Sequence, residues 1–318
     1  MVKEKLKEFF AFFRLHSQHR LNFCLAFIIF SLLPAKNYYT DLTINPGSPP
    51  VRFTNINLVP ISAYPVNFTG KQAPGLTAGS ALVIDVPSKA IIFSKNPDAK
   101  LFPASTTKIM TALVALDYYQ LSEIIEVKNV QRIGQLMGLE ENEEITFENL
   151  LYGLLVKSGN DVAYSLAQNY SGGVEGFIKA MNDKSQQLHL KNTNFTNPAG
   201  LDGYGHLSTT HDLAILASVA MENPVFRKIV ATREIEVKDV SGKISHTLEN
   251  VNQLLGKVEG LQGIKTGRTE NAGECLIGYT ERNGLKIITV ILGSEDRFGE
   301  TQKLTEWVFA NHEWQEIH

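Results

Sequence analysis

The sequence predicts an α+β fold within the α/β class, in which one antiparallel sheet is built from both ends of a domain and a block of helices is inserted between them. Two β-rich runs, 81–85 and 90–94, surround a short turn and have the spacing of a hairpin. Helical spacing of apolar residues begins after Pro103, and β-rich runs return from residue 233. This order of strands, helices and strands is the basis of the predicted class.

The central block is expected to contain five helices. In the first, apolar residues recur at helical spacing, at Ile109, Met110, Leu113 and Leu116. The other four are predicted at residues 147–156, 161–169, 173–188 and 210–221. Thr209, with Asp212 three residues later, is predicted to form a capping box at the start of the last helix.

Further β-rich runs and a terminal helix complete the predicted domain. The runs are residues 233–238, 243–247, 261–266, 275–281 and 286–292. Asn283-Gly284 joins the last two runs and has the sequence of a tight hairpin turn. A closing amphipathic helix is expected at about residues 300–312.

Residues 1–35 have the pattern of a signal peptide or an N-terminal membrane anchor. They hold five Lys and Arg against two Glu, and the apolar run at 21–35 is shorter than the about 20 residues of a spanning helix. Leu33 is larger than a cleavage site prefers, so removal and retention both remain open. Residues 36–75 hold six of the 12 prolines and are interpreted as an extended linker, which places the domain at 76–318.

The overall composition is that of a globular protein. A formal net charge of -3 with 20% charged residues argues against a nucleic-acid partner and against wholesale disorder. Cys24 and Cys275 lie too far apart to indicate a disulfide framework or a metal cluster, and the histidines lack metal-site spacing. The acidic cluster before residue 147 is interpreted as a solvated loop. Its members are Glu140, Glu141, Glu143 and Glu144.

The first chemical motif is Ser105-Thr106-Thr107-Lys108, at the start of the first predicted helix. A serine and a lysine three residues apart share a helix face, so the ammonium group can reach the hydroxyl. The start of a helix also supplies backbone N–H groups and a positive dipole end, which stabilise negative charge. Taken alone, the motif fits a capping serine with a solvated lysine better than it fits catalysis.

Two further motifs fall at the junctions of predicted elements. The tripeptide SGN at 158–160 lies between two helical patterns, where a hydroxyl and an amide can project together. The tripeptide KTG at 265–267 ends a predicted strand, where a lysine supplies positive charge and a glycine lets a substrate backbone approach. Each motif alone is better explained as a cap, a turn or a strand end.

Together and in this order, the three motifs resemble those of the serine D-Ala-D-Ala carboxypeptidases, the low-molecular-mass penicillin-binding proteins. The resemblance extends from about residue 78 to residue 307. It includes the segments PASTTKIMTAL, LLVKSGNDVA, NPAGLDGYGHLSTTHDLA and GIKTGRTENAG. It implies a β-lactamase/transpeptidase-like fold, with a five-stranded antiparallel sheet flanked by helices and an inserted all-helical subdomain.

The resemblance implies a catalytic group of four side chains. Ser105 would attack the carbonyl of the penultimate D-Ala, and Lys108 would be the base, provided that burial and Lys265 lower the pKa of its amine. Ser158 would relay a proton to the leaving nitrogen. Asn160 would hydrogen-bond the substrate amide and Lys108.

The resemblance also implies a binding strand. Lys265 and Thr266 would bind the terminal carboxylate, beside Gly267, and the backbone N–H groups of Ser105 and Arg268 would form the oxyanion hole. Some relatives carry an arginine upstream of KTG that residues 250–255 lack. The Arg268 side chain is therefore a candidate source of that charge, and a purely backbone role for Arg268 remains the alternative.

The implied partners are peptidoglycan stem peptides ending in D-Ala-D-Ala, covalent β-lactam inhibitors, and a membrane reached through the N-terminal segment at the extracytoplasmic face. No cofactor is implied. A DD-endopeptidase that cuts peptide cross-links would use the same residues. An inactive, anchored peptidoglycan-binding module is the alternative from a different class. A serine β-lactamase is disfavoured because no ExxLN-type segment lies between the second and third motifs.

Overall fold

A computed structural model describes residues 3–5, 7 and 62–316 of the chain. The apolar run predicted as a signal or anchor lies outside the described residues, as does most of the predicted linker. Within the described ranges, no helix has the length and apolar character needed to cross a membrane. The architecture below is that of residues 62–316.

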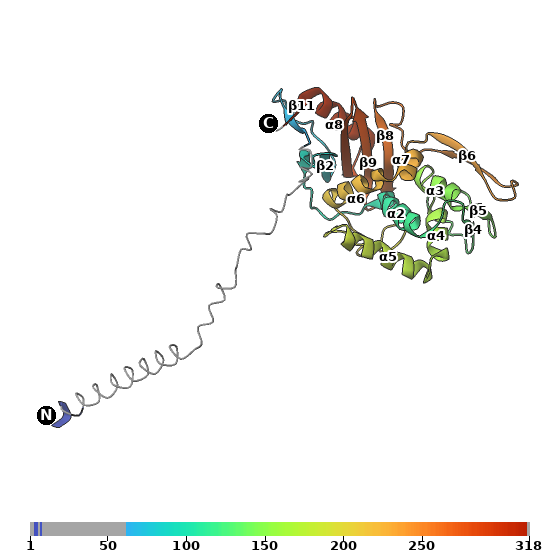
Figure 1. Ribbon diagram of the computed structural model, residues 1–318, viewed down its shortest axis with the longest axis horizontal. Coiled ribbons are helices and arrows are strands. Elements are labelled where there is room, and N and C mark those ends of the chain that lie inside the picture. The colour runs from blue at the N-terminus through green and yellow to red at the C-terminus, as the bar shows by residue number, and fades with distance from the viewer. Residues whose placement is uncertain (1–2, 6, 8–61, 317–318) are drawn as a thin grey trace, which may run out of the picture. The chain divides into compact units, whose positions relative to one another are not determined.

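The main sheet has five antiparallel strands in the order β3-β2-β10-β9-β8 (Figure 1). The strands are β2 (Ser80–Asp85), β3 (Ile91–Lys95), β8 (Leu261–Thr269), β9 (Gly273–Arg282) and β10 (Leu285–Ser294). The first two come from one end of the domain and the other three from its other end. This arrangement confirms the predicted fold class.

The hairpin predicted between the last two strands is present, and its turn follows from the residues at its tip. Asn283 and Gly284 both have positive φ angles, 52° and 82°, which suit the mirror-image turns that match strand twist. Arg282 and Leu285 pair directly across this turn. The early hairpin is also confirmed, because β2 pairs antiparallel with β3.

The two faces of the sheet are covered by different helices because side chains alternate along each strand. Leu82 of β2 pairs with Val290 of β10, and both belong to the large core beneath the central helices. Their neighbours Ala81 and Ile291 face the opposite way, into a second core completed by helix α8 (Arg297–Asn311). The sheet is thus buried on both sides.

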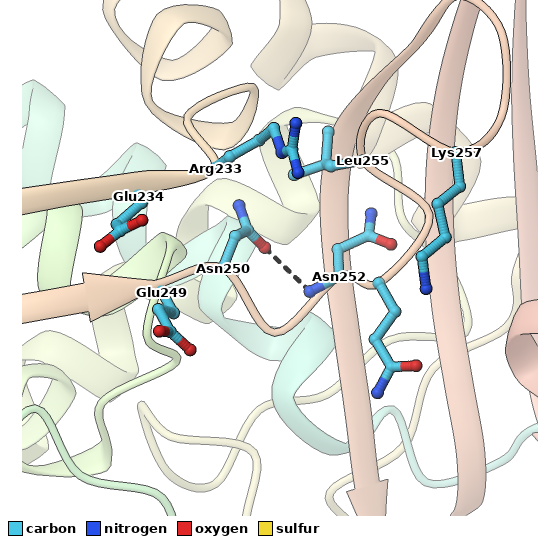
Figure 2. A pocket seen from close by; sticks show the side chains of 8 residues that line it. Arg233, Glu234, Glu249, Asn250, Asn252, Leu255 and Lys257 are labelled. Atoms are coloured by element: carbon cyan, nitrogen blue, oxygen red, sulfur yellow. Dashed lines mark hydrogen bonds between the residues drawn. The ribbon is translucent and has the colours of Figure 1, made fainter.

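Three smaller two-stranded sheets lie outside the main sheet. β6 (Glu234–Lys238) and β7 (Ser245–Glu249) form a separate hairpin, whose base faces the turn that leads into β8 (Figure 2). β4 (Ile124–Glu126) pairs with β5 (Glu144–Thr146), a sheet that the sequence does not predict. β1 (Tyr64–Asn67) pairs with β11 (His312–Gln315), so a strand lies within the segment interpreted as linker.

The predicted solvated acidic loop is wrong at one residue. Glu143 is only 3% exposed, and its Oε1 lies 2.9 Å from Nε2 of the buried His246 on β7. Its Oε2 accepts a hydrogen bond from the backbone N–H of Glu140. The cluster therefore combines exposed carboxylates with one that joins two small sheets, and sequence spacing gives no sign of the partner.

The helices form near their predicted positions. They are the 3₁₀ turn η1 (Ala104–Thr107), α2 (Lys108–Tyr118), α3 (Phe147–Leu155), α4 (Asn160–Asn169), α5 (Gly173–Gln187) and α6 (Thr210–Glu222). Thr209 caps α6 by accepting from the backbone N–H of Asp212, but the Asp212 carboxylate binds Asn192 and Thr193 rather than completing the box.

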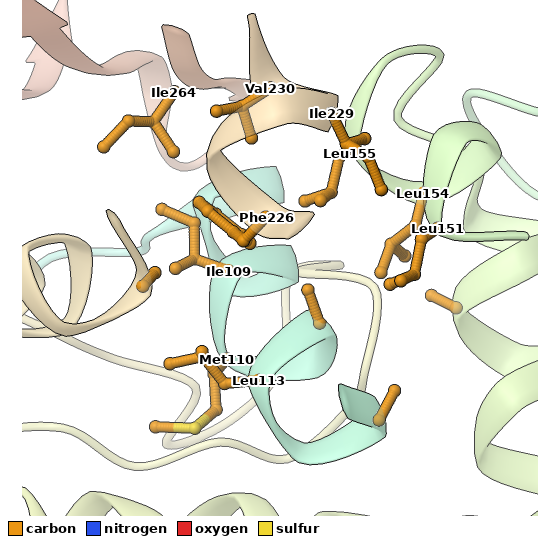
Figure 3. Close-up of a cluster of buried hydrophobic side chains, with 14 of the residues drawn as sticks. Ile109, Met110, Leu113, Leu151, Leu154, Leu155, Phe226, Ile229, Val230 and Ile264 are labelled. Atoms are coloured by element: carbon orange, nitrogen blue, oxygen red, sulfur yellow. The ribbon is translucent and has the colours of Figure 1, made fainter. Parts of the chain in front are cut away.

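One further short helix, α7 (Pro224–Val230), is absent from the sequence prediction although its start signals are present. Asn223 accepts two backbone hydrogen bonds at its N-terminus, and proline occupies the first turn. Figure 3 shows Phe226 and Ile229 of α7 among side chains from α2 and α3. This core fixes the start of α2 relative to β8 and so positions the candidate site.

Candidate active site

Ser105 and Lys108 meet at the point where η1 passes into α2. Lys108 Nζ lies within hydrogen-bond distance of Ser105 Oγ, at 3.0 Å, as their spacing of three residues permits. Ser105 is half-buried, whereas Lys108 is completely buried. The hydroxyl is therefore reachable from outside, while the amine is protected from water.

Lys108 Nζ has two further acceptors, both from other segments of the chain. Asn160 Oδ1 and the carbonyl oxygen of Ala199 each lie 2.6 Å from it. The contact with Ala199 uses its backbone carbonyl, so it does not depend on the side chain at this position. The three contacts fix the amine in one place beside Ser105.

The surroundings of Lys108 favour its neutral form. Its pKa lies well below the ordinary lysine value, first because burial penalises the charge and second because Lys265 is nearby, with Asp161 opposing the shift. A neutral amine has a lone pair that can accept the Ser105 proton. The arrangement can therefore generate a serine alkoxide without a histidine.

The 158–160 tripeptide joins this group through Asn160, the first residue of α4. Ser158 is buried and adopts a positive φ of 65° in the junction between α3 and α4. Asn160 Nδ2 donates to the carbonyl oxygen of Ile133, and the backbone N–H of Asn160 donates to the carbonyl oxygen of Gln135. The junction is thus held between Lys108 and the segment 128–143.

Asp161 is a supporting residue that the sequence does not single out. Its carboxylate accepts backbone hydrogen bonds from Met137, Gly138 and Leu139 at 2.8–3.1 Å. These bonds fasten the segment that holds Asn160. An aspartate directly after the tripeptide is a weak signal for such a role, because helix starts commonly carry aspartate.

β8 is an edge strand, and its Gly267 lies against the nucleophile. A Cβ atom at residue 267 would be 2.7 Å from the backbone nitrogen of Ser105 and 2.8 Å from Ala104 Cβ. Only glycine fits this approach without displacing the turn. The expected reason for the glycine was approach by a substrate backbone, whereas the contact seen is with the turn that carries Ser105.

Lys265 and Thr266 precede this glycine and are both buried, while the Arg268 side chain is exposed. Burial and the nearby Arg297 lower the pKa of Lys265 to about 7. Lys265 Nζ donates to the carbonyl of Thr266. The charge of Lys265 therefore depends on pH near neutrality.

Arg297 is the main site residue that the sequence reasoning missed. It is the first residue of α8, and its Nη1 donates to the carbonyl of Gly267 at 2.7 Å. Its Nε is buried without a hydrogen-bond partner among the described residues. No local motif connects Arg297 to KTG, because 30 residues and two strands separate them along the chain.

His206 supports the turn that carries Ser105 through a contact with Thr107. Its Nδ1 accepts from the backbone N–H of Thr196, and its Nε2 lies 2.9 Å from Thr107 Oγ1. Burial lowers the pKa of His206 to about 4. The ring is therefore neutral, with Nε2–H donating to Thr107.

A serine beside a neutral lysine amine, a buried asparagine and an open strand edge is the arrangement of an acyl-transferring serine enzyme that needs no histidine. The chain belongs to a family with that chemistry. Residues 67–296 match the family model described as D-alanyl-D-alanine carboxypeptidase. The predicted family is thereby confirmed, and the protein is a serine hydrolase of that family.

Relatives of both predicted activities are similar to this chain. The D-alanyl-D-alanine carboxypeptidase DacF of Bacillus subtilis is 33% identical over 256 residues, which cover 77% of this chain and 66% of the relative. The D-alanyl-D-alanine endopeptidase of Escherichia coli is 32% identical over 249 residues, covering 76% of this chain and 80% of the relative. The chain spans slightly less than two thirds of the DacF length.

Solved structures support the fold. The crystal structure of a Streptomyces DD-transpeptidase superposes with a TM-score of 0.72 at 31% identity. The match covers 76% of this chain and all of that protein. The observed sheet and inserted helices are therefore those of the predicted β-lactamase/transpeptidase-like fold.

Proposed function

We propose that this protein removes the terminal D-Ala from peptidoglycan stem pentapeptides through an acyl-enzyme at Ser105. The observation that carries this proposal is the 3.0 Å contact between Ser105 Oγ and the buried Lys108 amine. In the first step Ser105 Oγ bonds to the carbonyl carbon of the penultimate D-Ala. The amide C–N bond breaks and D-Ala leaves; water then hydrolyses the ester.

Lys108 acts as the base in this reaction. With its two N–H groups donated to Asn160 Oδ1 and to the Ala199 carbonyl, the lone pair of a neutral amine is directed to the Ser105 hydroxyl. The proton then passes through Ser158 to the leaving nitrogen. This route needs no charged group to enter the buried site.

The oxyanion is stabilised by the backbone N–H groups of Ser105 and Arg268. The close packing of Gly267 on Ser105 supports this assignment, because it brings the two backbone segments together. Losing one donor of this kind costs about 3 kcal/mol of transition-state stabilisation. Asn160 hydrogen-bonds the substrate amide that precedes the scissile bond.

The terminal carboxylate of the substrate binds at Lys265 and Thr266. Two arginines are candidate sources of further positive charge here. Arg268 follows the glycine directly but is exposed, whereas Arg297 is bonded to the Gly267 carbonyl and keeps a buried N–H without a partner. The second arrangement is better suited to a carboxylate, because the guanidinium is fixed and desolvated.

Export places this activity at the extracytoplasmic face of the cell membrane. The basic head and apolar run of residues 1–35 support export, with the N-terminal segment either removed or kept as a tether. The partners are then peptidoglycan stem peptides and, as covalent inhibitors, β-lactams. Intact Ser105 and Lys108 in contact argue against an inactive binding module.

A fluorescent penicillin tests the nucleophile and a stem pentapeptide tests the reaction. The full chain is expected to take up the label covalently and to release D-Ala from the pentapeptide. Ser105→Ala is expected to lose both. Label retained by Ser105→Ala would refute the assigned nucleophile, and labelling without D-Ala release would refute the carboxypeptidase reaction.

A further inference from the structure

The loop of residues 197–202 contacts two parts of the candidate active site, although the proposed mechanism uses only its Ala199 carbonyl. Gly200 packs on the turn that carries the nucleophile, because a Cβ atom at residue 200 would overlap the carbonyl oxygen of Ala104. Gly200 also has a φ of 84°, a conformation that favours glycine. Since Lys108 donates to the Ala199 carbonyl, the loop is in contact with both the base and the nucleophile's turn.

The 197–202 loop keeps one shape because a single side chain binds most of its backbone. Asn197 Oδ1 accepts hydrogen bonds from the backbone N–H groups of Ala199, Gly200 and Leu201 at 2.8–3.1 Å. Asn197 Nδ2 donates to the carbonyl of Leu201. Asparagine commonly fixes turns through such bonds to nearby backbone groups. The loop therefore moves as one unit with its last residue, Asp202.

Asp202 joins this loop to the end of β8. Its Oδ1 accepts a hydrogen bond from the hydroxyl of Thr269 at 2.6 Å, and its Oδ2 accepts from the backbone N–H of Asn271 at 3.2 Å. Thr269 is the last residue of β8, and its Oγ1 also accepts from the backbone N–H of Ala272. One carboxylate thus holds both the end of the strand and the turn into β9.

The end of β8 carries the second donor of the proposed oxyanion hole. β8 is the last strand of the sheet order, so its backbone is paired on one side only. The trans peptide unit between Gly267 and Arg268 contains that N–H, which points away from the carbonyl of the same unit. Arg297 binds this carbonyl, and Asp202 binds the side chain of the next residue, Thr269. The N–H is therefore held in position from both sides.

We infer that Asp202 is a positioning residue for the oxyanion hole and acts through Thr269. The inference rests on the proposed function, which assigns the Arg268 N–H to the oxyanion. The contact between Asp202 and Thr269 sets the separation between the nucleophile's turn, which packs on the 197–202 loop, and the end of β8. A donor stabilises an oxyanion only within about 2.7–3.1 Å of it, so a small shift of the strand end weakens this stabilisation.

The expected effect is on the rate of the chemical step rather than on substrate binding. The oxyanion forms only when the nucleophile attacks, so a misaligned Arg268 N–H lowers kcat. Binding of the terminal carboxylate depends on Lys265 and Thr266, which are buried and lie three or more residues before Thr269. A merely structural contact would instead lower the stability of the protein and leave kcat of the folded enzyme unchanged.

The first test measures kcat and KM for a stem pentapeptide in the full chain and its variants. Asp202→Ala removes both acceptors, Thr269→Val removes the hydroxyl, and Thr269→Ser retains it. Asp202→Ala and Thr269→Val are each expected to lower kcat about tenfold, less than the loss of a whole donor, with KM within about twofold. Thr269→Ser should stay within about twofold of wild type. The double variant Asp202→Ala/Thr269→Val should lose about tenfold rather than about hundredfold, because both changes remove one contact.

Asp239→Ala is the matched control. Asp239 accepts hydrogen bonds from the hydroxyl of Ser241 and from the backbone N–H of Ile244 in the turn between β6 and β7, away from the candidate active site. Its substitution is expected to leave kcat and KM unchanged. An unchanged kcat in Asp202→Ala, an equal loss in Asp239→Ala, a rise of KM alone, or additive losses in the double variant would overturn the inference and leave the carboxypeptidase reaction intact.

A second measurement does not depend on turnover. Hydrogen–deuterium exchange is followed by mass spectrometry on peptides that span residues 268–273, which include the N–H groups of Asn271 and Ala272. Exchange in these peptides is expected to be about tenfold faster in Asp202→Ala than in wild type and unchanged in Asp239→Ala. Unchanged exchange in Asp202→Ala would overturn the inference. A wild type that cleaves no pentapeptide would contradict the proposed function and, with it, this inference.

Discussion

The domain buries two pairs of ionisable side chains with opposite electrostatic designs. Lys108 and Lys265 each carry a positive charge only when protonated, and burial lowers the pKa of each, with Lys265 adding to the shift of Lys108. His246 and Glu143 are instead complementary, and their hydrogen bond raises the pKa of the histidine. The surroundings of the lysine pair disfavour its protonated form, whereas the Glu143 carboxylate favours the protonated form of His246.

This difference separates a reactive group from a structural one. A cation surrounded by burial and like charge gains by giving up its proton, which makes a base. A matched pair gains nothing from proton transfer, but breaking it leaves one buried polar group unsatisfied. We therefore expect substitutions at the lysine pair to change activity, and substitutions at the histidine pair to change stability.

The largest effect is expected for Lys108→Met, which removes the base and keeps the side-chain length. Acylation by a β-lactam should fall by about 10³-fold, within the range of general acid–base catalysis. Removing a desolvated amine beside Lys265 offsets the loss of its hydrogen bonds to Asn160 and Ala199, so the free energy of unfolding should change by about 1 kcal/mol or less. Stopped-flow labelling and urea unfolding measure the two quantities, with the exposed Lys100→Met as control. A large loss of stability with normal acylation would show that Lys108 serves stability rather than activity.

The next largest effect is expected for Gly267→Ala, which tests whether the lysine pair depends on the approach of β8 to η1. The new Cβ would lie 2.7 Å from the Ser105 nitrogen, so strand and turn must separate. Acylation should fall about 10²-fold, as loss of an oxyanion donor does. Gly75→Ala is the matched control, since nothing lies within 4 Å of its added methyl. Equal acylation rates in Gly267→Ala and Gly75→Ala would show that acylation does not depend on the contact between Gly267 and Ser105.

A smaller effect is expected at the two arginines near the carboxylate site. Arg297→Ala should raise KM for a D-Ala-D-Ala peptide about tenfold, equivalent to one hydrogen bond to a charged group. Arg268→Ala should raise KM about twofold or less, because its side chain is exposed. An unchanged KM for Arg268→Ala would leave that residue only its backbone role. A larger increase of KM in Arg268→Ala than in Arg297→Ala would show that Arg297 only holds β8 in position and does not bind the carboxylate.

The smallest effect on activity is expected for His246→Gln, which should instead lower stability by about 1–2 kcal/mol. The hydrogen bond with Glu143 raises the pKa of His246 in the folded protein above its ordinary value of about 6.5. The stabilisation from this pair is therefore fully present below about pH 6.5. The stabilisation is lost as the pH rises through the pKa of His246 in the folded protein. Chemical unfolding at about pH 6 and pH 9 should therefore show a difference from wild type that shrinks at the higher pH.

The exposed His211→Gln is the control for this titration, since its contact with Asp98 is 3.6 Å and open to solvent. A stability difference for His246→Gln that stays constant or grows with pH would contradict the proposed charged pair. A large loss of acylation in His246→Gln would contradict the division between the two pairs.

Local sequence signals account for most of the fold. Asn283-Gly284 predicts its turn because few other residues accept two positive φ angles in succession, and apolar periodicity predicts the helices because each must bury one face. Helix α7 was missed although Asn223 and Pro224 mark its start, because seven residues are too few to show periodicity. Its stability comes from packing of Phe226 in the core.

The candidate site is less accessible from sequence, because its supporting contacts join distant segments. Ser105 and Lys108 share a helix face and could be paired from spacing alone. Arg297 contacts the carbonyl of Gly267, and the Asp161 carboxylate receives N–H groups from a segment more than 20 residues earlier. Such contacts leave no local pattern, and neither does the burial of Glu143 against His246.

The pairing of β1 with β11 has a consequence for how the domain could be rebuilt. Tyr64 lies directly opposite Gln315, so the two ends of the domain at residues 64–315 are within about 5.5 Å of each other. A few added residues would close the chain into a ring, and the ring could be reopened at the exposed tip between β9 and β10. In such a circular permutant the lysine of KTG and the nucleophile would keep their positions in space while other links in the chain change, since the chemistry requires only that the groups meet.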